Sequence, residues 1–153
     1  MSCAIPASFE SLMSSLQDEP GVLVLDGPMD DDAARRALEV DGVAMAVESV
    51  AGARGDLLRV LCCFGALPDG ACTEILRRLL EVNFMMAAGP RPAHLGIDPA
   101  SGRVFYLFDA PRWQVSAPSL LSALRASAAE AKSWQASRWC DPSSMPGADH
   151  MSV

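Results

Sequence analysis

Apolar residues recur at every second position along the segment 57–65, and this spacing predicts a β-strand. The residues at its even-numbered positions are Leu58, Val60, Cys62 and Phe64. Because successive side chains of a strand point to opposite sides, these four are expected to share one face of a sheet. Pro68 and Gly70 follow the segment and are typical of a turn that ends a strand.

From Thr73 to Ala88 the apolar spacing changes to three and four residues, which predicts a helix that Gly89 and Pro90 end. Its apolar residues form two stripes, one with Leu76, Leu79 and Met86 and the other with Leu80 and Phe84. A helix that is apolar on two sides needs two partners, so we expect one face to pack on the chain's own sheet and the other on the same helix of a second subunit. The residues assigned to this homodimer interface are Leu76, Leu79, Val82, Asn83 and Met86.

The segments 94–97 and 104–108 are short and apolar, and the residues between them have the composition of a tight turn. Pro99 suits the second position of a turn, and Gly102 suits a position with positive φ. We therefore expect a β-hairpin. The side chains of its second strand divide between two faces, with Phe105 and Leu107 on one and Tyr106 and Phe108 on the other.

The segment 8–16 carries apolar residues at helical spacing and is closed by Asp-Glu-Pro-Gly, so we expect a short first helix. These apolar residues are Phe9, Leu12, Met13 and Leu16. Residues 22–25 follow as a continuous apolar run, which fits either a buried strand or a loop packed on the core.

Residues 29–38 are predicted to form a short helical turn capped by Asp30. Two charge pairs have the four-residue spacing of a helix, Asp31 with Arg35 and Asp32 with Arg36. Residues 38–50 then alternate as a strand does, and the loop 51–55 is expected to pair this strand with the strand at 57–65.

The last helix is expected after Ser116, with Pro118 in its first turn, where proline is tolerated. Its broad apolar side carries Leu120, Leu121, Leu124, Ala128, Ala131 and Trp134. We expect residues 1–140 to form a single domain and the short, polar, proline-broken segment 141–153 to be a disordered tail.

Together these elements predict an α+β fold with a twisted, mainly antiparallel sheet packed against about three helices. We expect the first helix and the helix at 73–88 to pack on the sheet and the C-terminal helix to cover one end of it.

The order and spacing of these motifs resemble the class I type III secretion chaperones, the Tir-chaperone-like (CesT) family. The residues that carry the resemblance are Phe64-Gly65-Ala66-Leu67-Pro68, Leu79-Leu80-Glu81-Val82-Asn83-Phe84, Leu95-Gly96-Ile97-Asp98 and Gly102-Arg103-Val104. The resemblance covers about residues 7–139. The acidic segment at 29–38 departs from the family pattern and leaves the registration of the first strand open.

This resemblance implies a homodimeric chaperone that has no catalytic activity and needs no cofactor. Such a protein holds the N-terminal chaperone-binding segment of a secreted effector in extended form, keeps it soluble and secretion-competent, and releases it to the secretion ATPase. Binding would rest on burial of effector side chains in apolar grooves and on strand addition at a sheet edge.

We place the effector groove between the first helix and the second strand of the hairpin, because only one face of that strand can be buried beneath the long helices. The residues assigned to this groove are Phe9, Leu12, Met13, Leu16, Phe105 and Leu107. Glu10 and Asp109 would form an acidic rim.

A net charge of -7 disfavours nucleic acid and anionic membranes as partners, because both are bound through Lys and Arg. The N-terminus has neither the basic start nor the long apolar run of a secretory signal, so we expect a cytoplasmic protein. The resemblance implies that it is bacterial. The five Cys make an odd count that fits reduced thiols. The eight Met suit a surface that must fit varied partners.

Candidate residues for catalysis or metal binding are few. Cys62 and Cys63 would point to opposite faces of a strand, and the aspartates at 30–32 lack the spacing and central glycine of a calcium loop. Two other classes of function stay open. One is a sensory or regulatory domain of similar topology that binds a fixed protein partner, and the other is a small enzyme that uses Cys63 or Cys72 with His94.

Overall fold

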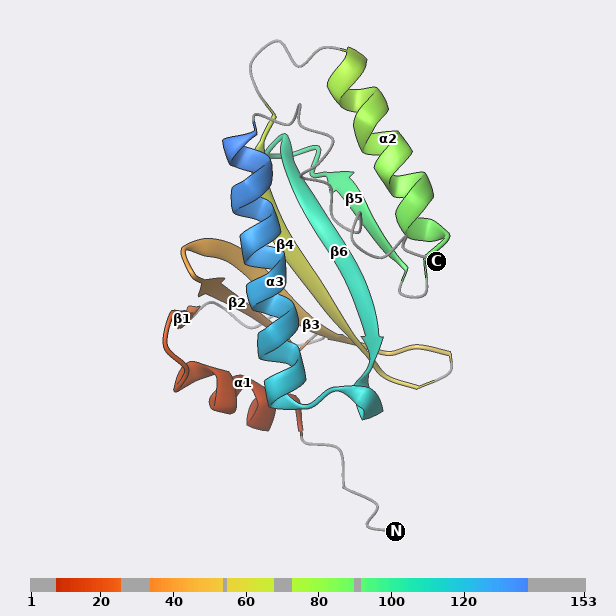
Figure 1. Ribbon diagram of the computed structural model, residues 1–153. Helices are drawn as coiled ribbons and strands as arrows, with labels where there is room; N and C mark the ends of the chain where they lie inside the picture. Colours follow the sequence, from red (N-terminus) through yellow and green to blue (C-terminus); the bar gives the residue numbers. More distant parts are fainter. Residues whose placement is uncertain (1–7, 26–33, 54, 68–72, 90–91, 138–153) are drawn as a thin grey trace, which may run out of the picture.

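The structure is a computed structural model, and it describes residues 8–25, 34–53, 55–67, 73–89 and 92–137 (Figure 1). In chain order its elements are α1 (Phe9–Gln17), β1 (Val22–Leu25), β2 (Arg35–Val40), β3 (Val43–Val50), β4 (Leu57–Ala66), α2 (Thr73–Ala87), β5 (Ala93–Ile97), β6 (Arg103–Pro111), the 3-10 turn η1 (Arg112–Gln114) and α3 (Ala117–Ala136). The predicted α+β class is confirmed. So are the strand at 57–65, the first helix, the helix from Thr73, the hairpin and the C-terminal helix.

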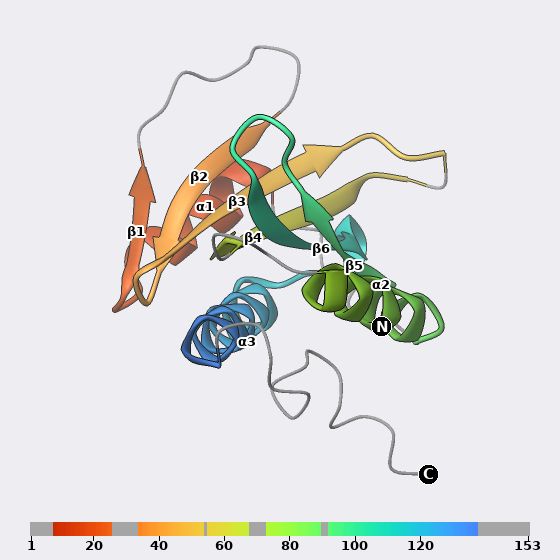
Figure 2. The ribbon, with the colours of Figure 1, turned by 90° about the horizontal axis from the view of Figure 1, so that it is seen from above.

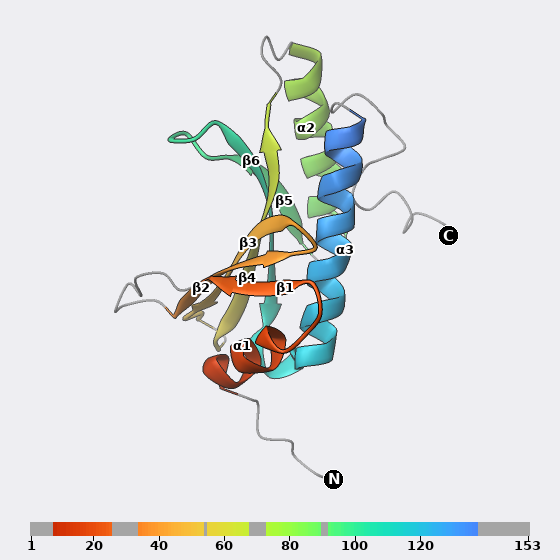
Figure 3. The same ribbon diagram turned by 90° about the vertical axis from the view of Figure 1, so that its left-hand side faces the viewer.

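The strands form one antiparallel six-stranded sheet in the order β1-β2-β3-β4-β6-β5. β1 and β5 are the two edges, and the long strand β4 lies between β3 and β6. The views from above and from the side show a twisted sheet with α2 and α3 on the same side (Figures 2 and 3). No described helix covers the other side, which we call the open face.

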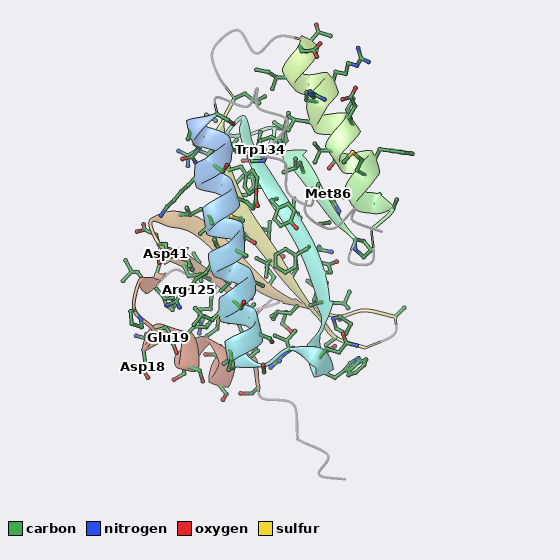
Figure 4. The ribbon with its side chains drawn as sticks, in the orientation of Figure 1. Asp18, Glu19, Asp41, Met86, Arg125 and Trp134 are labelled. Atoms are coloured by element: carbon green, nitrogen blue, oxygen red, sulfur yellow. The ribbon has the colours of Figure 1, made fainter. Side chains whose placement is uncertain are left out.

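The core lies between the sheet and α3. Phe64 of β4 is fully buried, and its ring centroid lies 5.6 Å from that of Tyr106 on β6 and 5.6 Å from that of Trp134 on α3 (Figure 4). Burial raises the pKa of Tyr106 above its ordinary value. Aromatic packing therefore joins β4 and β6 to the last turn of α3.

The position of α3 corrects the expectation that it covers one end of the sheet. Its apolar side is continuous from Leu120 to Trp134, and a helix of 20 residues is about 30 Å long. Such a stripe needs a long apolar surface to pack on, and α3 packs along β4, which provides one (Figure 1). α1 packs on the sheet at β1, as expected, and also against α3. Arg125 Nη2 of α3 donates to Pro20 O at 2.9 Å, near Glu19 in the turn that follows α1 (Figure 4).

Two serine caps fix where α1 and α3 begin. Ser11 N donates to the side chain of Ser8 at 3.1 Å, and Ser116 and Ser119 form a reciprocal capping box at the start of α3. These caps satisfy backbone N–H groups that have no partner inside the helix.

Residues 35–40 form β2, so the helical turn predicted for 29–38 is wrong in its second half. Leu38 and Val40 alternate into the core, and Asp41 and Gly42 make the turn to β3 with φ of 49° and 84°. Two positive φ values define the type I′ turn that Asp-Gly favours in hairpins. The Asp-Gly signal therefore divides the single strand that we predicted over 38–50 between β2 and β3.

The charged residues of β2 pair across the fold. Arg35 lies 2.9 Å from Glu48 of β3, and Arg36 lies 3.1 Å from Glu10 of α1. The predicted partners Asp31 and Asp32 lie outside the described residues. The four-residue spacing was misleading because the sheet register, rather than a helix, sets the neighbours of these arginines.

Candidate functional site

β4 and β6 place four apolar side chains on the open face. The register pairs Leu61 with Leu107 and Cys63 with Phe105. The alternate residues of both strands belong to the core, so these four side chains point away from the helices. Leu61, Phe105 and Leu107 are half-buried and thus partly accessible to a partner. We call the four residues the apolar band.

A row of paired charges crosses the open face beside the apolar band. The register brings together Arg35 and Glu48, Glu48 and Arg59, and Arg59 and Asp109. Arg59 donates two hydrogen bonds to the Asp109 carboxylate, at 2.8 and 2.9 Å, and these bonds raise the pKa of Arg59. Because the signs alternate and cancel, the row has no net charge, and the face offers a partner apolar contact rather than a charged field.

The pairing of β1 with β2 determines which backbone groups of β1 point outward. Asp41 N donates to Gly21 O at 2.8 Å, and bonded and non-bonded residue pairs alternate along an antiparallel ladder. Leu23 therefore directs its N–H and C=O to β2, whereas Val22 and Val24 direct theirs away from it.

Among the described residues, β1 is an edge that can accept another strand. Val22 N is occupied, because it donates to Glu19 O at 3.2 Å, but the structure gives Val24 no backbone partner on its outer side within the described ranges. The side chains of Leu23 and Leu25 are 57% and 42% exposed on the open face. Apolar side chains and unused backbone groups thus lie together at this edge.

The opposite edge, β5, is covered by α2. Asn83 of α2 donates from Nδ2 to Leu95 O at 2.8 Å, and Leu95 N donates to Asn83 Oδ1 at 2.6 Å. The two sheet edges are therefore not equivalent.

α2 is apolar on two sides, as the sequence predicted. Its inward side is formed by Ile75, Leu79 and Val82, which are buried, and by Met86, which packs on the core. Its exposed apolar residues are Leu76, Leu80, Phe84 and Met85. Leu80 is 70% exposed and Phe84 79%, so these two are the most accessible residues of an outer stripe on α2.

The structure separates the residues that the sequence assigned to a dimer interface. Leu76 is exposed, but Leu79, Val82 and Met86 face the chain's own core, and Asn83 is bonded to β5. Leu80 and Phe84 were assigned to the second stripe and were not included in the predicted interface. The spacing showed both stripes and lacked the information on which of them packs inward.

The predicted groove between the first helix and the hairpin strand does not form. The apolar residues of α1, Phe9, Leu12, Met13 and Leu16, are all buried in the core. β2, β3 and β4 lie between β1, against which α1 packs, and β6. The cause is that α1 has a single apolar stripe, which its own core uses completely. Phe105 and Leu107 do lie on an uncovered face, as expected, with Leu61 and Cys63 as neighbours that the sequence reasoning missed.

The geometry gives little support to the Cys–His enzyme. Cys62 is buried in the core and Cys63 on the open face, whereas His94 is exposed on β5, with β6 between it and β4. Cys72 lies outside the described residues. In the described part of the chain, no three His, Cys, Asp or Glu residues converge on a possible metal position.

None of the helices within the described ranges is long and apolar enough to cross a membrane.

We expect Cys62 to be almost inert to alkylation in the folded protein. Burial raises its pKa to about 12, which at pH near 8 lowers its thiolate fraction on the order of 1000-fold relative to an ordinary cysteine. Iodoacetamide labelling followed by mass spectrometry, with and without guanidinium, measures this protection. Rapid labelling of Cys62 in the folded protein would contradict the expectation.

Comparison with known proteins agrees with this architecture. The model of the Tir chaperone protein (CesT) family matches residues 28–135. A chain in the solved structure of the HopA1-SchA chaperone-effector complex has a similar fold, with a TM-score of 0.53 and 18% sequence identity over 82% of this chain and 88% of that chain. No curated protein matches the sequence. Because the family match covers more than half of the chain, the protein belongs to the Tir chaperone protein (CesT) family, the type III secretion chaperones that its motifs resemble.

Proposed function

We propose that the open face and the β1 edge bind the N-terminal segment of a secreted effector in extended form and keep it soluble and secretion-competent. The observation that carries this proposal is the position, on one side of the sheet, of an apolar band beside charges that are already paired. An unfolded segment brings apolar side chains and unpaired backbone groups, and the apolar band and the β1 edge offer a partner for each.

The binding would be the sum of modest contacts. A backbone hydrogen bond contributes about 0.5–1.5 kcal/mol, and a fully buried aliphatic side chain about 1.5–3 kcal/mol. Alternate side chains of an added strand would lie beside Leu23 and Leu25 on the open face, while its backbone pairs with Val24. Several such contacts are needed to offset the entropy lost when the segment becomes ordered.

We also propose that the protein is a homodimer formed through the outer stripe of α2. Leu80 and Phe84 lie one helical turn apart and are both largely exposed, which is unusual for large apolar side chains of a monomer. A second copy of the same stripe, related by a two-fold axis, is the simplest surface that covers them.

The proposed role is non-catalytic and cytoplasmic. The apolar band and the β1 edge bind by shape and backbone pairing, which require no nucleophile or cofactor. Reversible binding through several weak contacts also suits release of the effector to a secretion ATPase, because each contact can break separately.

We expect Val24→Pro to weaken effector binding at least about tenfold, or about 1.4 kcal/mol, while the fold persists. Proline removes an N–H group that points away from β2, so the β1–β2 ladder loses no hydrogen bond. The partner is first identified by co-purification from the native cell. Its N-terminal hundred or so residues are then titrated against each variant by calorimetry.

Leu23→Pro is the matched control, because it removes an N–H group that points to β2 and should lower the melting temperature. A folded Val24→Pro protein that binds the segment as tightly as the wild type would show that the β1 edge is not used. A partner that binds only as a folded domain would support the regulatory alternative.

A further inference from the structure

The side chain of Asn83 occupies both edge groups of the central residue of β5. Leu95 O accepts a hydrogen bond from Asn83 Nδ2 at 2.8 Å, and Leu95 N donates to Asn83 Oδ1 at 2.6 Å. A carboxamide has one donor face and one acceptor face, as a peptide unit does. The side chain thus makes the two bonds that a neighbouring strand would make at this position.

The register of the hairpin confirms that these groups belong to the outer edge. Asp98 N donates to Arg103 O at 2.9 Å, which makes this pair hydrogen-bonded. By alternation along the ladder, Gly96 directs its backbone groups to β6, whereas Leu95 directs its groups outward. A strand added to β5 would have to break both bonds to Asn83.

We propose that Asn83 closes the β5 edge to strand addition and thereby confines an extended partner to the β1 edge. This inference rests on the proposed function and adds a specificity-determining residue to it. A sheet with two open edges would take a segment at either end, and two copies could pair edge to edge. With β5 closed, the segment is directed to the edge that carries Leu23 and Leu25 on the open face.

Hydrogen exchange of the protein alone tests whether Asn83 closes the β5 edge. In Asn83→Leu, which has a similar volume and no amide, the Leu95 N–H should exchange at least about tenfold faster than in the wild type, because it loses its acceptor. The Gly96 N–H, bonded to β6, should stay protected. Glu81→Gln is the matched control on α2, since Glu81 pairs with Arg77 and Arg78 and not with β5. Unchanged protection of Leu95 in Asn83→Leu would overturn the inference.

Photo-cross-linking tests whether the extended partner binds only at the β1 edge. A benzophenone residue is placed at Leu23 or at Ile97, and the probe is the N-terminal segment of the co-purified partner. We expect cross-links only from position 23 in the wild type and from both positions in Asn83→Leu, a change that a loss of stability alone would not produce. Cross-links from position 97 in the wild type, or from position 23 alone in a folded Asn83→Leu protein, would overturn the inference. A wild type that cross-links at neither position refutes the proposed function, whereas the exchange measurement still decides whether Asn83 closes the edge.

Discussion

Replacing Leu80 and Phe84 together with glutamate is expected to convert the proposed dimer into a stable monomer. Both side chains are exposed in the chain by itself, so the substitutions cost the monomer little. In a two-fold interface each change occurs twice and places carboxylates in an apolar contact. We expect dimerisation to weaken at least about 100-fold, or about 2.8 kcal/mol, as measured by light scattering over a concentration series.

Leu79→Glu is the control for this experiment. Leu79 lies on the inward side of the same helix and is buried, so a carboxylate there should lower the melting temperature instead of releasing folded monomers. Wild-type protein that remains monomeric at micromolar concentration would refute the dimer. A double variant that stays dimeric would place the interface elsewhere.

The two sides of α2 show what the spacing of apolar residues can predict and what it cannot. Residues at spacings of three and four showed that the helix is apolar on two sides, and this is correct. The pattern does not show which stripe is buried in the chain's own core, because both stripes are equally apolar. Asn83 held the missing information, since its amide bonds to β5 fix which side of the helix meets the sheet. The sequence reasoning assigned Asn83 to the dimer interface and so missed that its amide marks the side of α2 that faces β5.

The first half of the sheet was harder to predict for a different reason. Arg35 and Arg36 follow three aspartates, and the local spacing favoured a helical turn. The alternation of Leu38 and Val40 and the Asp-Gly turn after them indicate a hairpin, which buries apolar side chains as well as pairing the arginines. Burial outweighs exposed ion pairs, which contribute about 0–1 kcal/mol each, so the hairpin is the stable choice.

The open face was predicted only in part, because a single strand shows its two faces but not its neighbours. The alternation in the hairpin separated Phe105 and Leu107 from Tyr106 and Phe108 correctly. Their contact with Leu61 and Cys63 depends on the register between β4 and β6, which brings together residues more than forty positions apart in the chain. Long-range registers of this kind leave little trace in local spacing.

We expect Phe105→Glu to weaken binding of the effector segment at least about tenfold while the protein stays folded. The side chain is half-buried within the apolar band, so a carboxylate there remains hydrated in the free protein. Binding of an apolar segment would remove that hydration without supplying a partner charge, because the segment brings none and Arg59 already pairs with Asp109. Leu61→Glu should act in the same direction for the same reason.

Met13→Glu provides the contrast. Met13 is 3% exposed in the core beneath α1, so its substitution should lower the free energy of unfolding by more than about 3 kcal/mol and reduce binding only through loss of folded protein. Calorimetric titration of the effector segment and thermal unfolding of each variant separate the two effects. If Phe105→Glu and Leu61→Glu remain folded and bind the segment with wild-type affinity, the effector does not contact the open face, and the β1 edge alone must account for binding.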